Sequence, residues 1–241
     1  MINFAHRGAS AIYPENTILA FKKAIEINSD GIELDVHKSK DNKLVVIHDE
    51  DIRRTYDGEG LVQNFTLEEL KRFKNKSKDY SENIECRIPT LEEVLKLIKD
   101  TRIILNIELK TDEIHYFNIE EDVLNLINKY GIKNRVIISS FNHESLKICR
   151  SLDSEIKLGV LYDKKIENVI SYAKDLKANA IHPDVTLVNK ELIEEAHRNN
   201  VKVNTYTVDC KEIMKNLYSL GVDGVFTNKP DLLKKVIKEQ F

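Results

Sequence analysis

Gly31 to His37 reads Gly-Ile-Glu-Leu-Asp-Val-His, a short β-strand pattern with two acidic side chains where a buried strand would carry apolar ones. Because successive side chains of a strand point to opposite faces, Glu33 and Asp35 share one face and the apolar residues share the other. Two adjacent carboxylates repel each other unless a proton or a cation lies between them. One interpretation is a divalent metal held by oxygen ligands, and the other is a solvated strand edge. The stretch alone does not decide between them.

The composition predicts one globular domain. The 241 residues are 41% hydrophobic and 32% charged, which supplies apolar side chains for a core and charge to cover it. No stretch approaches the roughly 18 consecutive apolar residues of a membrane span. The first residues also lack the basic and apolar regions of a signal peptide. We therefore expect a cytoplasmic protein without stable membrane insertion.

Cysteine spacing and charge argue against several kinds of site. Cys86, Cys149 and Cys210 lie far apart without a Cys-x-x-Cys pair, which argues against a disulfide framework and a thiolate zinc site. The formal net charge is −3, and Lys and Arg are scattered along the chain, so we expect no nucleic-acid partner. The sequence leaves the oligomeric state open.

Strand and helix patterns alternate along the chain, as in an α/β protein with a parallel sheet. Parallel strands followed by helices are expected to begin near Phe4, Gly31, Ile103, Val136, Lys157, Ala180, Val203 and Gly224. Eight such units close a TIM-type (β/α)8 barrel. Residues 50–88 are polar and irregular, apart from a short helix predicted between Thr66 and Lys74. We therefore interpret 1–241 as a single barrel domain with a small insertion, 50–88, after the second strand.

The run from Leu44 to Asp49 predicts a further strand that returns beside the Gly31 strand as an antiparallel hairpin. The link between them is too short for a helical crossover, which takes about a dozen residues. With Asp41-Asn42 as a two-residue turn, His48 would lie directly opposite Asp35. His37 is expected to face outward along this hairpin.

Catalytic groups of such a barrel come from the C-terminal ends of its strands, because the loops that follow them open on one face. This rule selects His6, Arg7, Glu33, Asp35, His48, Glu108 and Lys110. Glu108 and Lys110 are two residues apart and share a face, as Glu33 and Asp35 do. The sequence therefore predicts a site of acids, bases and histidines at one end of the barrel.

These residues lie in motifs that resemble the glycerophosphodiester phosphodiesterase family. The motifs are His6-Arg7-Gly8, Pro14-Glu15-Asn16-Thr17, Glu33-x-Asp35, His48-Asp49, Ile107-Glu108-Leu109-Lys110 and Tyr206-Thr207-Val208, and their order and spacing match across the whole chain. The resemblance implies a TIM-type barrel that hydrolyses glycerophosphodiesters to glycerol 3-phosphate and an alcohol. It also implies one divalent cation, Mg²⁺ or Ca²⁺, at the positions of Glu33, Asp35 and Glu108. The chain departs from the family at Tyr206, where tryptophan is common, and at Asp209, where asparagine is common.

The chemistry of the selected residues fits these roles. Three carboxylates without a thiolate favour a hard cation that can bind a phosphate oxygen. Arg7 and Lys110 can hold the remaining phosphate oxygens. His6 and His48 can serve as base and acid near neutral pH, and the sequence leaves open which is which.

Several other residues are expected to shape the site without a role in proton transfer. Phe141 and Tyr206 are predicted to wall the glycerol pocket. Glu15 and Asn16 are expected to brace the first loop rather than to touch substrate. His182 ends a strand at the active face, where a substrate contact and a purely structural role are equally compatible with the sequence.

Two other functions remain open from the sequence. One is a lysophospholipase D-type phosphodiesterase that acts on lipid substrates with the same metal and histidines, which would need an apolar landing surface. The other is a barrel that has lost catalysis and only binds phosphorylated ligands. Retention of both histidines and all three carboxylates argues against the second, but this fold hosts many chemistries.

Overall fold

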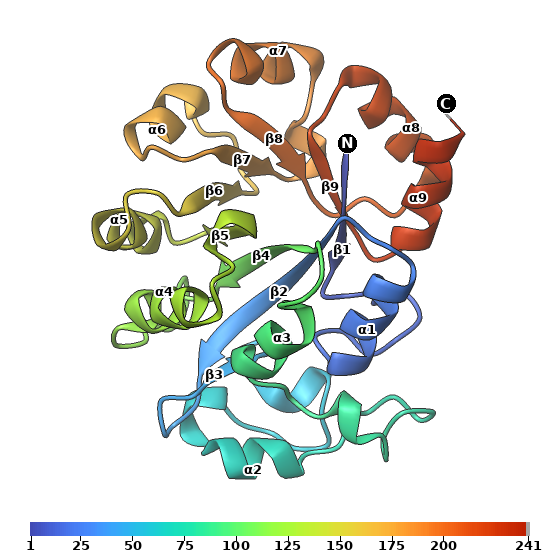
Figure 1. Ribbon diagram of the computed structural model, residues 1–241, viewed down its shortest axis with the longest axis vertical. Coiled ribbons are helices and arrows are strands. Elements are labelled where there is room, and N and C mark those ends of the chain that lie inside the picture. Colours follow the sequence, from blue (N-terminus) through green and yellow to red (C-terminus); the bar gives the residue numbers. More distant parts are fainter. Residues whose placement is uncertain (240–241) are drawn as a thin grey trace.

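Parallel strands that alternate in side-chain character close into a ring, and helices surround it (Figure 1). The structure is a computed structural model that describes residues 1–239. The ring strands are β1 (Ile2–His6), β2 (Gly31–Lys38), β4 (Ile104–Leu109), β5 (Val136–Ser140), β6 (Lys157–Tyr162), β7 (Ala180–Pro183), β8 (Lys202–Thr205) and β9 (Gly224–Thr227). β1 pairs with both β2 and β9, which closes the barrel. The predicted TIM-type fold is confirmed.

The helices lie outside the ring, mostly one after each strand (Figure 1). They are α1 (Ile18–Glu26), α2 (Leu67–Arg72), α3 (Leu91–Ile98), α4 (Ile119–Tyr130), α5 (His143–Leu152), α6 (Val169–Asp175), α7 (Lys190–Arg198), α8 (Lys211–Leu220) and α9 (Pro230–Lys238). Thr90 caps α3: its hydroxyl accepts from the Glu93 amide, and the Glu93 carboxylate accepts from the Thr90 amide. This reciprocal pair satisfies two amide groups that would otherwise lack partners at the helix start.

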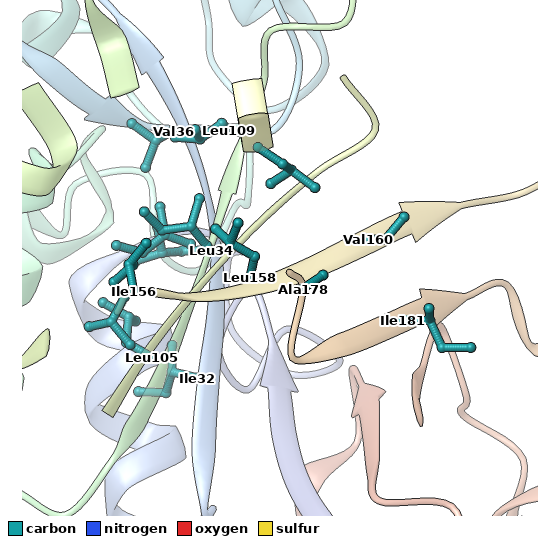
Figure 2. Packing of buried hydrophobic residues seen from close by; sticks show 14 of the residues in the cluster. Ile32, Leu34, Val36, Leu105, Leu109, Ile156, Leu158, Val160, Ala178 and Ile181 are labelled. Carbon is teal, nitrogen blue, oxygen red and sulfur yellow. The ribbon is translucent and has the colours of Figure 1, made fainter. Parts of the chain in front are cut away.

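The main core lies between the strands and the surrounding helices. Ile32, Leu34 and Val36 point outward from β2 and are fully buried there. Figure 2 shows them with Leu105 and Leu109 of β4, the strand that pairs with β2. Leu158 and Val160 of β6 belong to the same buried cluster. Because neighbouring residues of a strand face opposite sides, this packing directs Glu33 and Asp35 into the barrel. The hydrophobic core therefore sets the direction of the acidic side chains.

Leu158→Ala is expected to lower the free energy of unfolding by about 2–5 kcal/mol, because it leaves a cavity in this core. The Leu158 side chain is fully buried. Leu152→Ala is the matched control, since Leu152 ends α5 and is 51% exposed, and its loss should stay within about 0.5 kcal/mol. Urea unfolding followed by circular dichroism measures both variants. Equal losses would contradict the packing described for β6.

The hairpin is confirmed, but its predicted register is wrong. β3 (Leu44–Val46) is antiparallel to β2 and lies outside the ring, with Val36 opposite Val46. Ile47 rather than His48 is level with Asp35, and its amide donates to the Asp35 carbonyl (3.1 Å). The cause is the link 39–43, which is longer than a two-residue turn. In it the Lys43 amide donates to the Ser39 hydroxyl (2.9 Å), and Asn42 has a φ of 58°.

The prediction that His37 faces outward is also wrong. Its ring is fully buried between the Tyr116 hydroxyl (2.9 Å from Nδ1) and the His48 carbonyl (3.0 Å from Nε2). Tyr116 lies in the loop after β4, which covers this side of the hairpin. His37 thus ties the backbone of His48 to the barrel.

Residues 50–88 form α2 and the short 3-10 turns Ile52–Arg54, Val62–Asn64 and Ile84–Cys86, drawn beside β3 in Figure 1. Their apolar side chains make a small cluster with the hairpin return: Val45, Ile47, Ile52, Tyr56, Val62, Leu70 and Ile88. The hairpin therefore anchors this segment at the side of the barrel. Within residues 1–239, no helix combines the length and the apolar character needed to cross a membrane.

Candidate functional site

Three carboxylates converge inside the barrel. Glu33 and Asp35 come from β2 and Glu108 from β4, and the pairing of these strands places Asp35 opposite Glu108. One oxygen of each carboxylate lies within 4.8 Å of the others. Glu33 Oε1 and Asp35 Oδ1 are buried and accept no hydrogen bond from the described residues. Buried oxygens without donors are costly unless a cation or water satisfies them, so this cluster fits a hard divalent cation.

Crowding of the three acids shifts their pKa values. Burial, together with the charges of Asp35 and Glu108, raises the pKa of Glu33 well above its usual value. Burial and Asp35 raise the pKa of Glu108 to about 7. Burial acts in the same direction on Asp35, but Arg7 and His48 outweigh it and hold the pKa of Asp35 below its usual value. Without a cation, the cluster therefore retains protons near neutral pH.

The turn after β1 places Arg7 beside these acids. Its φ of 55° lies in the left-handed region, which is uncommon for a residue other than glycine. In this conformation the Arg7 amide donates to Glu33 Oε2 (2.9 Å). The guanidinium donates to Glu15 (2.9 Å) and lies 3.5 Å from Asp35 Oδ2. Arg7 thus meets the acidic cluster through both its backbone and its side chain.

Two further polar side chains donate hydrogen bonds to the carboxylates. Lys110 Nζ donates to Glu108 Oε1 (3.2 Å), and Asn16 Nδ2 donates to Asp35 Oδ2 (2.7 Å). Lys110 is buried, like Glu33 and Asp35, whereas Glu108 is half-buried. The first loop therefore contacts the site through Asn16 as well as through the Glu15–Arg7 pair.

His6 ends β1 at the edge of the acidic cluster. Its Nδ1 lies 2.8 Å from Asn228 Oδ1, and its Nε2 lies 3.9 Å from Glu33 Oε2. Burial, assisted by the positive charge of Arg7, lowers the pKa of His6 to about 4. The ring is therefore neutral at physiological pH in the absence of a cation.

His48 approaches the same cluster from the chain segment after β3. Its Nδ1 lies 2.6 Å from Asp49 Oδ1. Arg54 Nε donates to the second oxygen of Asp49, and the Arg54 guanidinium also binds Glu15 (2.6 and 2.9 Å). Burial raises the pKa of Asp49, but the hydrogen bonds from His48 and Arg54 bring it well below its usual value. His48 thus has an anionic partner, whereas His6 has a neutral one.

A cavity of about 200 Å³ joins these groups at the C-terminal end of the barrel. Its lining residues are His6, Arg7, Glu33, His48, Asn106, Glu108, Phe141, Leu161, His182, Tyr206, Thr207 and Phe226. The rings of Phe141 and Tyr206 meet edge to face at 6.0 Å on one wall. Of the residues selected from the sequence, Asp35 and Lys110 lie behind this lining and contact it through Arg7 and Glu108.

His182 lines the same cavity and is fully buried. Its Nε2 lies 3.1 Å from Asn204 Nδ2, and burial lowers its pKa to about 3. A Cβ at Gly159 would come within 2.4 Å of the ring, so the glycine leaves the room that His182 occupies. His182 is thus a neutral, tightly packed side chain of the barrel interior.

Sequence reasoning missed three residues that contact the histidines or their partners. Asn228 follows β9, and the rule used for the other strand ends would have selected it. Asp49 directly follows His48 and was named from the sequence only within the His48-Asp49 motif, without a role. Arg54 lies in the segment after the hairpin and carries no local signal, because its partners Glu15 and Asp49 come together only in the folded chain.

Comparisons with known proteins agree with one another. Residues 6–232 match the model of the glycerophosphoryl diester phosphodiesterase family. The glycerophosphodiester phosphodiesterase of Caldanaerobacter subterraneus subsp. tengcongensis is 43% identical over 235 residues, which cover 98% of this chain and 97% of that relative. The glycerophosphodiester phosphodiesterase of Bacillus altitudinis is 41% identical over 239 residues, which cover 98% of this chain and 98% of that relative.

Solved structures give the same result. A phosphodiesterase from Oleispira antarctica, in complex with the product sn-glycerol-3-phosphate, superposes with a TM-score of 0.89 at 26% identity, covering 99% of this chain and 97% of that one. The glycerophosphodiester phosphodiesterase of Thermotoga maritima superposes with a TM-score of 0.81 at 30% identity, covering 98% of each chain.

Proposed function

This chain belongs to the glycerophosphoryl diester phosphodiesterase family, and from this premise we propose a metal-dependent, two-histidine mechanism for its hydrolysis of glycerophosphodiesters. It is a glycerophosphodiester phosphodiesterase, as are the named relatives at 41 and 43% identity. The products are glycerol 3-phosphate and an alcohol. The observation that carries the mechanism is the convergence of three carboxylates and two histidines around one cavity.

Glu33, Asp35 and Glu108 would hold one divalent cation, Mg²⁺ or Ca²⁺. The buried, unpartnered oxygens of Glu33 and Asp35 fit such an ion, and oxygen ligands suit both metals. When bound, the cation supplies positive charge against the negative charge that develops on the phosphate. Arg7 and Lys110 would bind and orient phosphate oxygens, since both are cations placed beside the acidic cluster.

His6 and His48 would divide the proton transfers between them. His6 is neutral at physiological pH, so its ring can accept the proton of the attacking hydroxyl, from water or from the glycerol group of the substrate. His48 bonds through Nδ1 to the Asp49 carboxylate, which stabilises the ring when it is charged. His48 would therefore donate the proton that the leaving alcohol takes up. Phe141 and Tyr206 would enclose the glycerol moiety.

The proposal extends to the setting of the enzyme. Residues 1–241 would act as one barrel domain, with 50–88 as an insertion beside the pocket. The substrate would be a small glycerophosphodiester in the cytoplasm, where the free thiols of Cys86, Cys149 and Cys210 stay reduced.

Purified protein is expected to release glycerol 3-phosphate from glycerophosphocholine, glycerophosphoethanolamine or glycerophosphoglycerol when Mg²⁺ or Ca²⁺ is present. A coupled glycerol 3-phosphate dehydrogenase assay measures the product. Lysophosphatidylcholine serves as the comparison substrate, with turnover measured by choline release because its cleavage leaves lysophosphatidic acid rather than glycerol 3-phosphate. Faster turnover of it would move the assignment to a lysophospholipase D-type enzyme. Failure to cleave any glycerophosphodiester with either ion would contradict the proposed function.

A further inference from the structure

We propose that Asp209 is a positioning residue that sets, through Asn228, which ring nitrogen of His6 carries a proton. The proposal rests on the role of His6 proposed above. It also gives a function to a position at which this chain departs from the family it resembles. Asp209 follows β8 and Asn228 follows β9, so both lie at the C-terminal end of the barrel beside β1.

The Asp209 carboxylate accepts three hydrogen bonds. Its Oδ2 accepts from the Asn228 side-chain amide nitrogen (2.6 Å). Its Oδ1 accepts from the Asn228 backbone amide (2.8 Å) and from the Thr227 hydroxyl (3.0 Å). The side chain of Asn228 therefore lies between Asp209 on one side and His6 on the other.

Hydrogen-bond chemistry determines the orientation of the Asn228 amide. A carboxylate can only accept, so the NH₂ group of Asn228 must face Asp209 and its oxygen must face His6. That oxygen lies 2.8 Å from His6 Nδ1 and can only accept as well. Nδ1 must therefore carry the proton in the neutral ring. The lone pair is left on Nε2, the nitrogen on the side of Glu33 in the cavity.

Asp209→Asn is expected to reverse this chain of donors and acceptors. The backbone amide of Asn228 and the Thr227 hydroxyl keep an oxygen at the Oδ1 position, so the new NH₂ group replaces Oδ2. Two NH₂ groups would then face each other, and Asn228 must turn its amide to present oxygen to residue 209. Its NH₂ group now donates to His6 Nδ1, which places the ring proton on Nε2. A ring in this state cannot accept a proton from the attacking hydroxyl.

The expected result for Asp209→Asn is a loss of kcat of about 10²-fold, with KM changed by less than about threefold, as for a lost base. The exchanged variant Asp209→Asn/Asn228→Asp should recover to within about tenfold of wild type. In it, the new amide donates to the new carboxylate, which again accepts from His6 Nδ1. Asp231→Asn on α9 is the matched control for loss of a half-exposed carboxylate that does not contact Asn228, and the activity of this variant should not change.

Long-range ¹H–¹⁵N NMR of the imidazole nitrogens tests the proton position without relying on activity. His6 should carry its proton on Nδ1 in wild type and in the exchanged variant, and on Nε2 in Asp209→Asn. A wild-type ring protonated on Nε2 would overturn the proposal, whether or not the variants fold. So would a folded exchanged variant that stays as slow as Asp209→Asn. If wild type were inactive, the NMR result would still decide the role of Asp209 separately from the proposed function.

Discussion

Treatment with EDTA is expected to reduce phosphodiesterase turnover to background, and added Mg²⁺ or Ca²⁺ should restore it. Glu33, Asp35 and Glu108 place carboxylate oxygens within 4.8 Å of one another, with two of these residues holding an unpartnered buried oxygen. Without a cation they repel each other and retain protons. Turnover that survives thorough chelation would remove the metal from the mechanism.

Glu108→Gln should have the same effect as chelation, because it keeps the size of the side chain and removes its negative charge. Glu144→Gln is the control, since Glu144 is an exposed acid in the first turn of α5 and does not line the cavity. We expect the first variant to lose metal binding and activity and the second to keep both. Calorimetric titration with Mg²⁺ and Ca²⁺ measures the binding.

Metal affinity is also expected to fall as the pH decreases from about 8 to 6. Burial raises the pKa of Glu108 to about 7 and raises that of Glu33 well above its usual value, so protonation of these carboxyls competes with cation binding as the pH falls through this range. A cation must displace those protons, and this cost increases as the pH falls. Titration in two buffers with different ionisation enthalpies should report proton release on binding. An affinity that does not change with pH would contradict the raised pKa values.

The parts of the site that follow from local strand geometry could be predicted from the sequence. Alternation along β2 placed Glu33 and Asp35 on one face, and the same reasoning placed Glu108 of β4 on the same side as Lys110, which directly follows the strand. These inferences need only the side-chain period of a strand and the rule that strand ends meet at one end of a barrel. The alternation of eight strand and helix patterns along the chain predicted the closed ring of parallel strands.

Other parts of the site could not be predicted from strand periodicity. The level of His48 on the hairpin depends on the length of the turn 39–43, in which the Lys43 amide donates to the Ser39 hydroxyl. The burial of His37 depends on Tyr116, which belongs to a later loop. Arg54 orients Asp49 and Glu15 only after the segment 50–88 has packed beside the hairpin. For His37 and Arg54, a distant side chain rather than a local pattern determines the arrangement.

His6→Ala and His48→Ala are each expected to lower kcat by roughly 10²- to 10⁴-fold, the usual loss when a positioned proton-transfer group is removed. Both variants should fold, since neither ring belongs to the hydrophobic core. His115→Ala is the control, because His115 is exposed and lies outside the cavity. Near-ultraviolet circular dichroism checks the fold, and product release measures kcat.

A substrate with a good leaving group should separate the two histidines. The p-nitrophenyl ester of glycerol 3-phosphate releases p-nitrophenolate, which leaves without taking up a proton, so a general acid contributes little to its cleavage. The deficit of His48→Ala should therefore shrink on this substrate, because His48 donates through a ring held by Asp49. The deficit of His6→Ala should persist, because the attacking hydroxyl must still lose its proton. Equal deficits for His48→Ala on the two substrates would contradict its role as the acid. If instead the deficit of His6→Ala shrinks on the p-nitrophenyl substrate, His6 would be the acid and His48 the base.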